Sequence, residues 1–158
     1  MGVNEPAYLL REARTDDLAG VVGICRDSGG LTWTAEMIAR EPIRTVVVAT
    51  VGGELAGVAK THHHPEADGA APEGHYLGGI VVGPRWRRLG IGTMLTKARL
   101  DWTWERSDRA FYFANKHNTA SIQLHKTLGF QPIATAPTFH GVTADGQSHL
   151  ILFSAKRR

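Results

Sequence analysis

Hydrophobic residues recur along the chain with two different periods, one typical of strands and the other typical of helices. Apolar residues three and four positions apart predict four helices: Leu18–Cys25, Thr34–Arg40, Gly90–Glu105 and Thr119–Leu128. Short runs rich in β-branched and aromatic residues predict seven strands: Tyr8–Arg11, Arg44–Val51, Glu54–His62, Tyr76–Val82, Arg109–Ala114, Phe130–Thr135 and Ser148–Phe153. Hairpins come first, and strands then alternate with helices.

This order predicts a single domain of mixed α/β or α+β class over residues 1–158. Hairpins give antiparallel pairs, and a strand–helix–strand sequence gives at least one parallel pair. Two segments without a clear period, His63–Gly74 and Pro137–Gly146, are expected to be loops, and the first is the best candidate for a mobile loop. The basic end Lys156–Arg158 is expected to be a solvated tail.

Composition is that of a globular protein, since 42% of the residues are hydrophobic and 21% are charged. The net charge of +3 favours an anionic ligand but is too small to predict nucleic-acid binding. Cys25 is the only cysteine, so neither an intramolecular disulfide nor a cysteine-rich metal site can form. The sequence shows no signal-peptide pattern and no apolar run of roughly 18 residues, so we expect a cytoplasmic protein.

A glycine-containing loop joins the strand Tyr76–Val82 to the helix that follows it. Gly90 and Gly92 lack Cβ atoms, so a ligand can approach the main chain there. The first N–H groups of a helix have no partner within it, and the helix dipole adds positive charge, which suits phosphate. Arg87 and Arg88 add charge that pairs with pyrophosphate. The loop also fits a surface turn with solvated arginines, whereas Walker and Rossmann patterns match poorly.

The segment Asn115–Phe130 contains a second cluster of polar residues beside apolar ones. Projected at about 100° per residue, its helix places His125 in the apolar arc with Leu124 and Leu128. A histidine in such a position is either a satisfied core residue or part of a site, and the projection leaves both interpretations open.

Together, the two segments resemble motifs A and B of the GNAT family of N-acetyltransferases. The R/Q-x-x-G-x-G/A pattern of motif A matches Arg87, Gly90 and Gly92. The N-x-x-N-x-x-A/S-x-x-L-Y-x-x-x-G-F pattern of motif B matches Asn115, Asn118, Ser121, Leu124, Gly129 and Phe130. The resemblance implies a GNAT-like fold, in which a mostly antiparallel sheet with about four helices has one parallel strand pair that splays to hold the cofactor.

The resemblance also implies that acetyl-CoA is the donor, that no metal takes part, and that an amine attacks the thioester directly. The pyrophosphate would bind the main chain of Arg88–Thr93, and the pantetheine arm would extend the strand edge at Ile80–Val82. A strand N–H at or beside Val82 would be the oxyanion donor. The residues implied in cofactor binding are Ile80, Val81, Val82, Arg87, Arg88, Leu89, Gly90, Ile91, Gly92, Thr93, Asn115, Asn118 and Ser121.

One position departs from the family pattern. The family usually has a tyrosine that is often assigned as the acid protonating the CoA thiolate, and this chain has His125 instead. A neutral histidine keeps one N–H donor, and its ordinary pKa is about 6.5. We expect His125 to be the catalytic acid, although an ordinary thiol pKa of about 8.5 leaves open that this proton transfer is not critical.

The acceptor amine must be neutral to attack, so a base assists the reaction. Glu73, His75 and Tyr76 stand at the start of the strand expected to carry the thioester, and Glu73 and His75 are the catalytic candidates. The candidates for binding the acceptor are Trp33, His62, His64 and Tyr76. Adjacent histidines on a strand alternate between its faces, and no carboxylate has clear ligand spacing, so we expect no metal site.

These residues predict an acetyl-CoA-dependent N-acetyltransferase that acts on a primary amine of a small molecule. Two alternatives stay open: an enzyme that acetylates N-termini or lysines of proteins or peptides, and a non-catalytic acyl-CoA-binding module. Neither nucleic acid nor a membrane is an expected partner. A homodimer is a common arrangement among similar proteins, although the sequence does not fix the oligomeric state.

Overall fold

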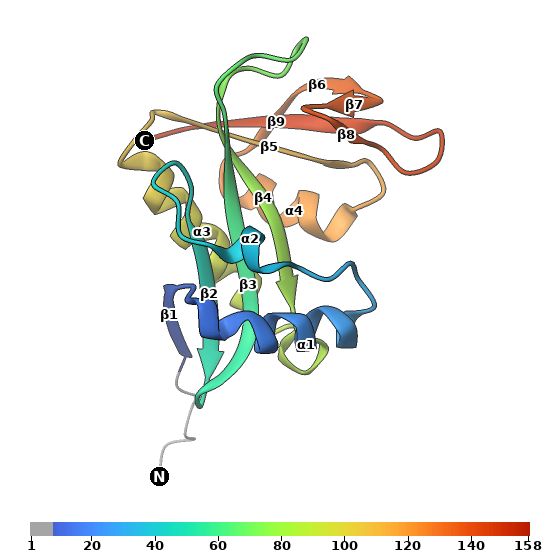
Figure 1. Ribbon diagram of the computed structural model, residues 1–158. Helices are drawn as coiled ribbons and strands as arrows, with labels where there is room; N and C mark the ends of the chain where they lie inside the picture. Colours follow the sequence, from blue (N-terminus) through green and yellow to red (C-terminus); the bar gives the residue numbers. More distant parts are fainter. Residues whose placement is uncertain (1–7) are drawn as a thin grey trace. The chain divides into compact units, whose positions relative to one another are not determined.

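The computed structural model describes residues 8–158, in which seven strands form one mixed sheet (Figure 1). The strand order is β1-β2-β3-β4-β5-β9-β6. The strands are β1 (Tyr8–Glu12), β2 (Val46–Val51), β3 (Glu54–His64), β4 (Gly74–Val82), β5 (Arg109–Asn115), β6 (Gln131–Ala136) and β9 (Leu150–Lys156). Strands β4 and β5 are parallel, with Tyr76 opposite Phe111, whereas β1–β2, β2–β3, β5–β9 and β6–β9 are antiparallel.

Four α-helices accompany the sheet in the described residues (Figure 1). They are α1 (Leu18–Ser28), α2 (Ala35–Ile38), α3 (Ile91–Trp104) and α4 (Thr119–Thr127), with short 3-10 helices at Thr15–Asp17 and Pro84–Trp86. The predicted mixed sheet with one parallel pair and about four helices is therefore confirmed. The opening of the parallel pair toward a cofactor stays a prediction.

The chain divides into two compact units. The first unit comprises the described part of Met1–Lys60 together with Gly79–Arg99, and the second comprises Thr61–Gly78 and Leu100–Arg158. Strands β3 and β4 and helix α3 each supply residues to both units. The assignment of residues 1–158 to a single domain stays a prediction.

In the first unit, β2 and β3 bury apolar side chains on two faces. On one face, Val48 shares a cluster with Val21 of α1. On the other face, Ala59 shares a cluster with Leu95 of α3. Gly57 allows α3 to lie close to β3, because a Cβ at this position would be 2.9 Å from Leu95 Cδ1.

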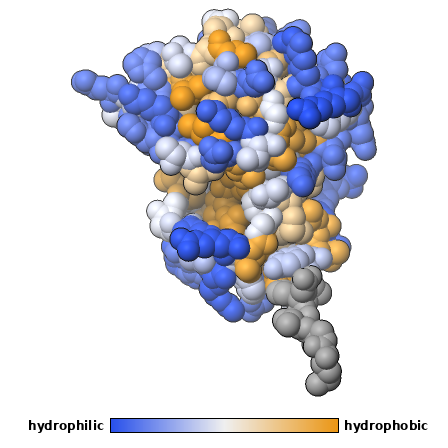
Figure 2. All heavy atoms as spheres, turned by 180° about the vertical axis from the view of Figure 1, so that it is seen from behind, coloured by the Kyte–Doolittle hydropathy of each residue, from blue (hydrophilic) through white to orange (hydrophobic). Residues whose placement is uncertain are grey.

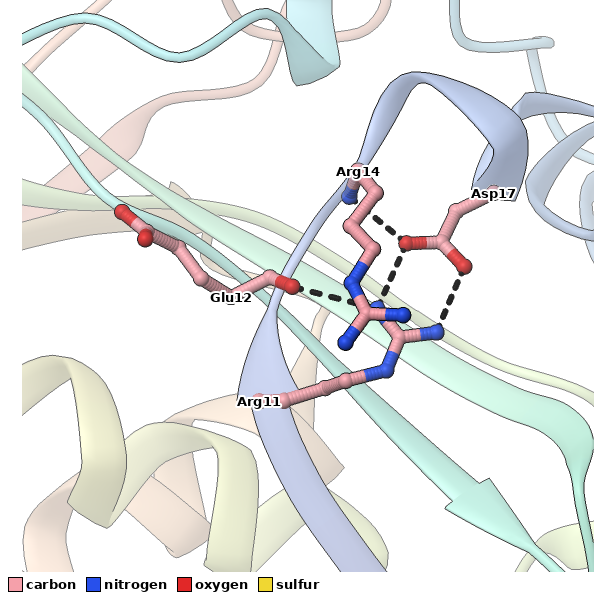
Figure 3. A network of polar contacts seen from close by, with 4 residues as sticks. All are labelled: Arg11, Glu12, Arg14 and Asp17. Carbon is pink, nitrogen blue, oxygen red and sulfur yellow. Dashed lines mark hydrogen bonds and ion pairs between the residues drawn. The ribbon is translucent and has the colours of Figure 1, made fainter.

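An ion pair joins the end of β1 to the start of α1 in the first unit (Figure 3). The guanidinium of Arg11 donates two hydrogen bonds of 2.8 Å to the carboxylate of Asp17, and the main-chain N–H of Arg14 donates a third of 2.7 Å. The hydrogen bonds from Arg11 hold the pKa of Asp17 below its ordinary value, although burial opposes this shift. Since the charged carboxylate is favoured in the folded state, this stabilising contribution is lost as the pH falls through the lowered pKa.

In the second unit, β5 supplies side chains to two apolar clusters. Tyr112 belongs to the cluster that contains Phe130, whereas its neighbour Phe111 belongs to the cluster that contains Tyr76 and Phe139. Successive strand residues point to opposite faces, so β5 separates these two environments.

Two segments of the second unit are more regular than expected. The predicted loop Pro137–Gly146 contains a short hairpin of β7 (Thr138–Phe139) and β8 (Val142–Thr143). Its turn is made by His140 and Gly141, whose φ angles of 47° and 80° are the left-handed values that a tight hairpin requires. The predicted loop His63–Gly74 begins later, because β3 continues to His64.

The basic end of the chain was expected to be solvated, and Lys156–Arg158 are exposed, but Arg157 is also anchored by hydrogen bonds. Its N–H donates to the carbonyl of Asp108 at 2.9 Å, and its guanidinium donates to the carbonyl of Trp104 at 2.6 Å. Strand β9 itself continues to Lys156. Regular structure therefore continues past Phe153, where the apolar pattern of the predicted strand ends, and the hydrogen bonds of Arg157 hold the residue that follows β9.

Figure 2 shows hydrophilic residues around the rim of one face, with hydrophobic atoms exposed between them. None of the helices in residues 8–158 is both long enough and apolar enough to cross a bilayer.

Candidate functional site

The loop after β4 presents main-chain N–H groups at the start of α3, within the first unit. The N–H of Met94 donates to the carbonyl of Gly90 at 3.0 Å, so Gly90 directly precedes the helix. The N–H groups of Ile91, Gly92 and Thr93 therefore have no acceptor inside α3. Gly90 has a φ of +80°, and a Cβ built there would meet no atom of a non-neighbouring residue within 4 Å. An anion can therefore reach this helix end over Gly90.

Three arginines surround this loop, and they are engaged to different degrees. Arg85 lies 3.4 Å from the carboxylate of Glu54 and over the ring of Trp86. Arg87 donates a long hydrogen bond of 3.4 Å to the last carbonyl of β4. Arg88 has a φ of 64°, is exposed, and forms none of the ion pairs found among the described residues. Arg88 is the cation best able to accept a phosphate as its partner.

At the end of β4 the polar groups available to a ligand are those of the main chain. Ile80 and Val82 pack into the core cluster that contains Leu95, and Val81 packs into the cluster that contains Val21. These side chains are committed to the core of the first unit, so the polar groups of the strand are what remains for recognition. Leu89, by contrast, is 45% exposed in the loop.

The polar residues of motif B lie in the second unit. Asn118 is exposed and directly precedes α4, where its carbonyl accepts the N–H of Ile122 at 3.0 Å. Asn115 ends β5, and its side-chain oxygen accepts the hydroxyl of Ser148 at 3.2 Å. Ser121 is half-buried in the first turns of α4. Their proposed contacts with the cofactor stay predictions.

His125 is a buried residue of α4 whose ring lies flat against Tyr112 of β5. The ring centroids are 3.5 Å apart and the rings are inclined by 3°. Only 1% of His125 is exposed. Nδ1 of His125 lies 2.7 Å from the carbonyl oxygen of Ser121, and the hydroxyls of Tyr112 and Ser121 are hydrogen-bonded to each other. A phenol and an imidazole therefore share one small cluster.

The hydrogen bond to Ser121 determines which nitrogen of His125 carries the proton. A carbonyl oxygen only accepts, so Nδ1 carries the proton and donates it. In the neutral ring, Nε2 then has a lone pair and no proton to release. The acid role predicted for His125 therefore requires the doubly protonated imidazolium. Tyr112, which the sequence analysis did not single out, adds a phenolic proton at the same place.

The two predicted bases at the start of β4 have different surroundings. Glu73 is exposed, whereas His75 packs edge-on against Trp102, with the ring of His63 at 4.7 Å. Burial lowers the pKa of His75, and the charges of His63 and Arg106 lower it further. Nδ1 of His75 is enclosed and has no hydrogen-bond partner among the described residues. His75 is therefore a neutral ring at neutral pH.

Tyr76 belongs to a group of hydrogen bonds that fastens the β7–β8 hairpin to the loop before β4. Its hydroxyl donates to the carbonyl of Pro72 at 2.6 Å, and Nε2 of His140 lies 3.1 Å from the same hydroxyl. The main-chain N–H of His140 donates to the carboxylate of Asp68 at 2.7 Å. We call Asp68, Pro72, Tyr76 and His140 the loop clasp. Burial raises the pKa of Tyr76, so its phenol stays protonated at neutral pH.

Two of the histidines predicted to bind the acceptor lie near the loop clasp. His64 stacks on His140 with ring centroids 3.9 Å apart, and His62 lies 6.1 Å from His64. Burial lowers the pKa of His64, and the charges of His140 and His63 lower it further. Within residues 8–158, no three His, Cys, Asp or Glu side chains are grouped so that they could hold a metal ion.

Trp33, the remaining predicted acceptor residue, is buried in the first unit with 6% of its surface exposed. The ammonium of Lys60 lies over its ring, 4.7 Å from the centroid. Neither Lys60 nor His140 has a local sequence signal that marks it, because each acquires its partners from distant segments.

One cavity of the second unit lies away from these groups. It has a volume of about 660 Å³ and is lined near the ends of α4 and β9, with Leu128, Ile133 and Lys156 in its wall. Of the residues that match the motifs it contains only Gly129, and none of the residues predicted to act in catalysis or to bind the cofactor or the acceptor lines it. We therefore assign the site from hydrogen bonds and chemistry rather than from cavity size.

Several solved structures resemble this chain closely enough to show its fold. The ribosomal-protein-S18-alanine N-acetyltransferase from Escherichia coli is 21% identical, with 95% of this chain and 94% of that chain covered and a TM-score of 0.74. YncA, a putative acetyltransferase from Salmonella typhimurium solved with its cofactor acetyl-CoA, is 21% identical, with coverages of 96% and 95% and a TM-score of 0.74. Ard1 from Thermoplasma volcanium is 22% identical, with coverages of 96% and 99% and a TM-score of 0.75.

No curated protein sequence matches the chain. The sequence pattern of the Acetyltransferase (GNAT) family matches residues 8–130, which is most of the chain. The chain therefore belongs to the Acetyltransferase (GNAT) family and is an acyltransferase.

Proposed function

We propose that this acetyltransferase acetylates a primary amine of a small molecule by direct attack of the amine on the thioester. The observation that carries the use of acetyl-CoA is the helix start after Gly90, where an open main chain lies beside exposed arginines. These groups fit a pyrophosphate, because amide hydrogens and cations converge on space that no side chain fills.

The residues of the first unit would bind and orient the donor. The N–H groups of Ile91, Gly92 and Thr93, with Arg88, would hold the pyrophosphate, and the main chain of Ile80–Val82 would hold the pantetheine arm. Acetyl-CoA, when bound, supplies an acetyl group activated as a thioester.

The residues of the second unit supply groups that hold protons. Tyr112 Oη keeps a phenolic proton beside Ser121 Oγ, whereas Nδ1 of His125 already gives its proton to a carbonyl. We assign protonation of the CoA thiolate to this cluster. The phenol of Tyr112 would donate the proton, and the ring of His125 would support the ring of Tyr112.

The loop clasp also supplies a group that can accept a proton from the amine. Nε2 of His140 lies 3.3 Å from the carbonyl oxygen of Pro72 and also faces the hydroxyl of Tyr76. Because that hydroxyl donates its own proton to the Pro72 carbonyl, both neighbours of Nε2 are acceptors. Nε2 must therefore carry a proton, and Nδ1 of the neutral ring keeps a lone pair. Glu73 and His75 stay candidates, but His75 is enclosed by aromatic rings.

The loop clasp favours a small acceptor over a protein chain. Asp68 binds the main chain of His140 across a large sequence separation, so two loops are joined above Tyr76 and His64. An extended peptide needs an open groove with main-chain partners, and joined loops restrict such a groove.

An acceptor screen tests the proposal. Purified protein with acetyl-CoA is offered small primary amines, peptides with free N-termini and lysine peptides, and thiol release is followed by colour. We expect turnover of small amines with a higher kcat/KM than any peptide. A preference for peptides would contradict the proposed acceptor class, and tight CoA binding with no transfer to any amine would indicate a binding module.

A further inference from the structure

Lys60 is a cation buried in the first unit without an acidic partner. It lies on β3, and only 7% of its surface is exposed. Its ammonium lies over the ring of Trp33, 4.7 Å from the centroid, and none of the ion pairs among the described residues includes it. Burial of an ammonium is costly unless an anion or hydrogen-bond acceptors compensate for the lost water.

The surroundings of Lys60 increase the positive charge rather than balance it. Burial lowers the pKa of Lys60, and the charge of Arg44 lowers it further. Asp17 is the only buried acidic residue among the described residues of the first unit, and it is paired with Arg11. The interior of this unit therefore has a cation that no buried carboxylate neutralises.

Hydrogen bonds connect Lys60 to the start of α3. The fully buried guanidinium of Arg99 donates to the carbonyl of Lys60 at 3.2 Å and to the hydroxyl of Thr96 at 3.0 Å. Thr96 in turn donates to the carbonyl of Gly92 at 2.8 Å. The main chain at Lys60 and the predicted pyrophosphate-binding helix start are therefore held by one connected set of bonds.

A glycine packs closely against the Trp33–Lys60 pair. Gly79 is exposed, and a Cβ there would lie 3.3 Å from Trp33 Cζ2 and 3.7 Å from Lys60 Cε. Because Gly79 is exposed, the Trp33–Lys60 pair lies directly against an exposed part of the main chain. Gly79 directly precedes Ile80–Val82, the strand edge predicted to hold the pantetheine arm, so the pair lies next to the expected position of the donor.

We propose that Lys60 binds a carboxylate of the acceptor, and that the acceptors are therefore amino acids or closely similar amino carboxylates. The inference rests on the proposed function and specifies its substrate class. The carboxylate would supply the negative charge that no described ion pair gives to Lys60, and the ring of Trp33 would hold the ammonium in place. The contact with the indole stabilises the charged form of Lys60, which favours anion binding over a role as a proton acceptor.

Matched acceptors test the inference. L-Amino acids of differing side chain are each compared with the corresponding carboxamide and the decarboxylated amine, using thiol release with wild type and Lys60→Met. We expect Lys60→Met to raise KM for the carboxylates about 10- to 100-fold, the range of a charge-assisted hydrogen bond, and to change kcat much less. The carboxamides should react equally well with both proteins. Lys60→Arg should restore part of the affinity, and Lys97→Met, which removes an exposed lysine of α3, should behave as wild type.

A second variant keeps the test informative if Lys60→Met folds poorly. Gly79→Ala adds a single methyl group that would press on Trp33 Cζ2 at 3.3 Å and leaves the ammonium intact, so it should also raise KM for carboxylates. Circular dichroism and acetyl-CoA affinity report the integrity of each variant.

The possible failures are distinguishable. Equal kcat/KM for carboxylates, carboxamides and amines, or an equal loss on all three in Lys60→Met, would overturn the inference while leaving the proposed function intact. Absence of thiol release with every amine, despite bound acetyl-CoA, would instead contradict the proposed function itself.

Discussion

The start of α3 and the cluster of Tyr112, Ser121 and His125 at α4, which we call the α4 cluster, lie in the two segments that match the family's motifs. The first offers main-chain groups, whereas the second offers side chains. At the start of α3, the groups proposed to meet a ligand are main-chain N–H groups, and the glycine would contribute by having no side chain. In the α4 cluster, the chemistry resides in side chains, where Tyr112 from β5 lies against His125. A main-chain site depends on local conformation, whereas a side-chain site depends on which distant residue becomes a neighbour.

The largest effect is expected from changing the main-chain site. Gly90→Val should weaken acetyl-CoA binding by more than about 100-fold, because a branched side chain would occupy the space for phosphate and a positive φ is strained for valine. Gly53→Val is the matched control, since Gly53 has a φ of +87° and equally open space but lies in the β2–β3 turn. Calorimetry with acetyl-CoA should show near wild-type affinity for the control. Equal losses in both variants would mean that strain alone explains the effect.

The next effect concerns the side-chain cluster. Tyr112→Phe should lower kcat by about 10²- to 10⁴-fold, the range for loss of a general acid, with little change in acetyl-CoA affinity. His125→Phe keeps an aromatic ring in the stack and should lower kcat less. His125→Tyr introduces the residue usual in the family and should retain activity. If His125→Phe proves the more damaging variant, His125 and not Tyr112 is the acid.

A smaller effect should appear in the pH dependence of stability, at histidines that belong to neither of these two regions. The pKa values of His64 and His75 are lowered in the folded state, so the unfolded chain binds protons first as the pH falls below about 6.5. The free energy of unfolding should therefore decrease from about pH 6.5 downward until the lowered pKa values are reached. Urea titrations at neutral and acidic pH should show a weaker dependence in His64→Gln than in the exposed control His117→Gln. An unchanged dependence would remove His64 from the titrating groups.

The smallest effect is expected at the loop clasp. Asp68→Ala removes the acceptor of the His140 N–H, a bond whose net contribution is about 1 kcal/mol. KM for the acceptor should rise a few-fold while kcat and acetyl-CoA affinity stay close to wild type. Hydrogen exchange at the His140 amide should become faster. Exchange at the wild-type rate would show that Asp68 does not hold the hairpin.

The contrast between main-chain and side-chain sites also explains how far the sequence could predict the molecule. The helices and strands follow from local periodicity, and Gly90 could be identified because its function needs only a helix start and no Cβ. His125 was correctly placed on an apolar arc, but its ring could not be oriented without knowing that Tyr112 of β5 stacks on it. The resemblance alone therefore suggested the acid role but not the tautomer.

His140 and Lys60 were missed for related reasons. His140 contacts Tyr76 because a hairpin turn places it there, and the sequence of that segment had predicted an irregular loop. Lys60 occupies an ordinary position in a β-strand. Its proposed role depends on the lack of a second buried acidic residue among the described residues of the first unit, which only the packed structure shows. Residues whose role depends on what surrounds them in space have no fixed spacing in a sequence.

The flat contact between Tyr112 and His125 has a spectroscopic consequence. Two parallel, stacked aromatic rings at this separation place the carbon-bound protons of one ring in the shielding region above the face of the other, so the His125 resonances should lie upfield of those of an exposed histidine such as His117. The displacement depends on the stacking itself and not on catalysis. Proton magnetic resonance can therefore follow the arrangement of this cluster during a titration with acetyl-CoA, without an added probe.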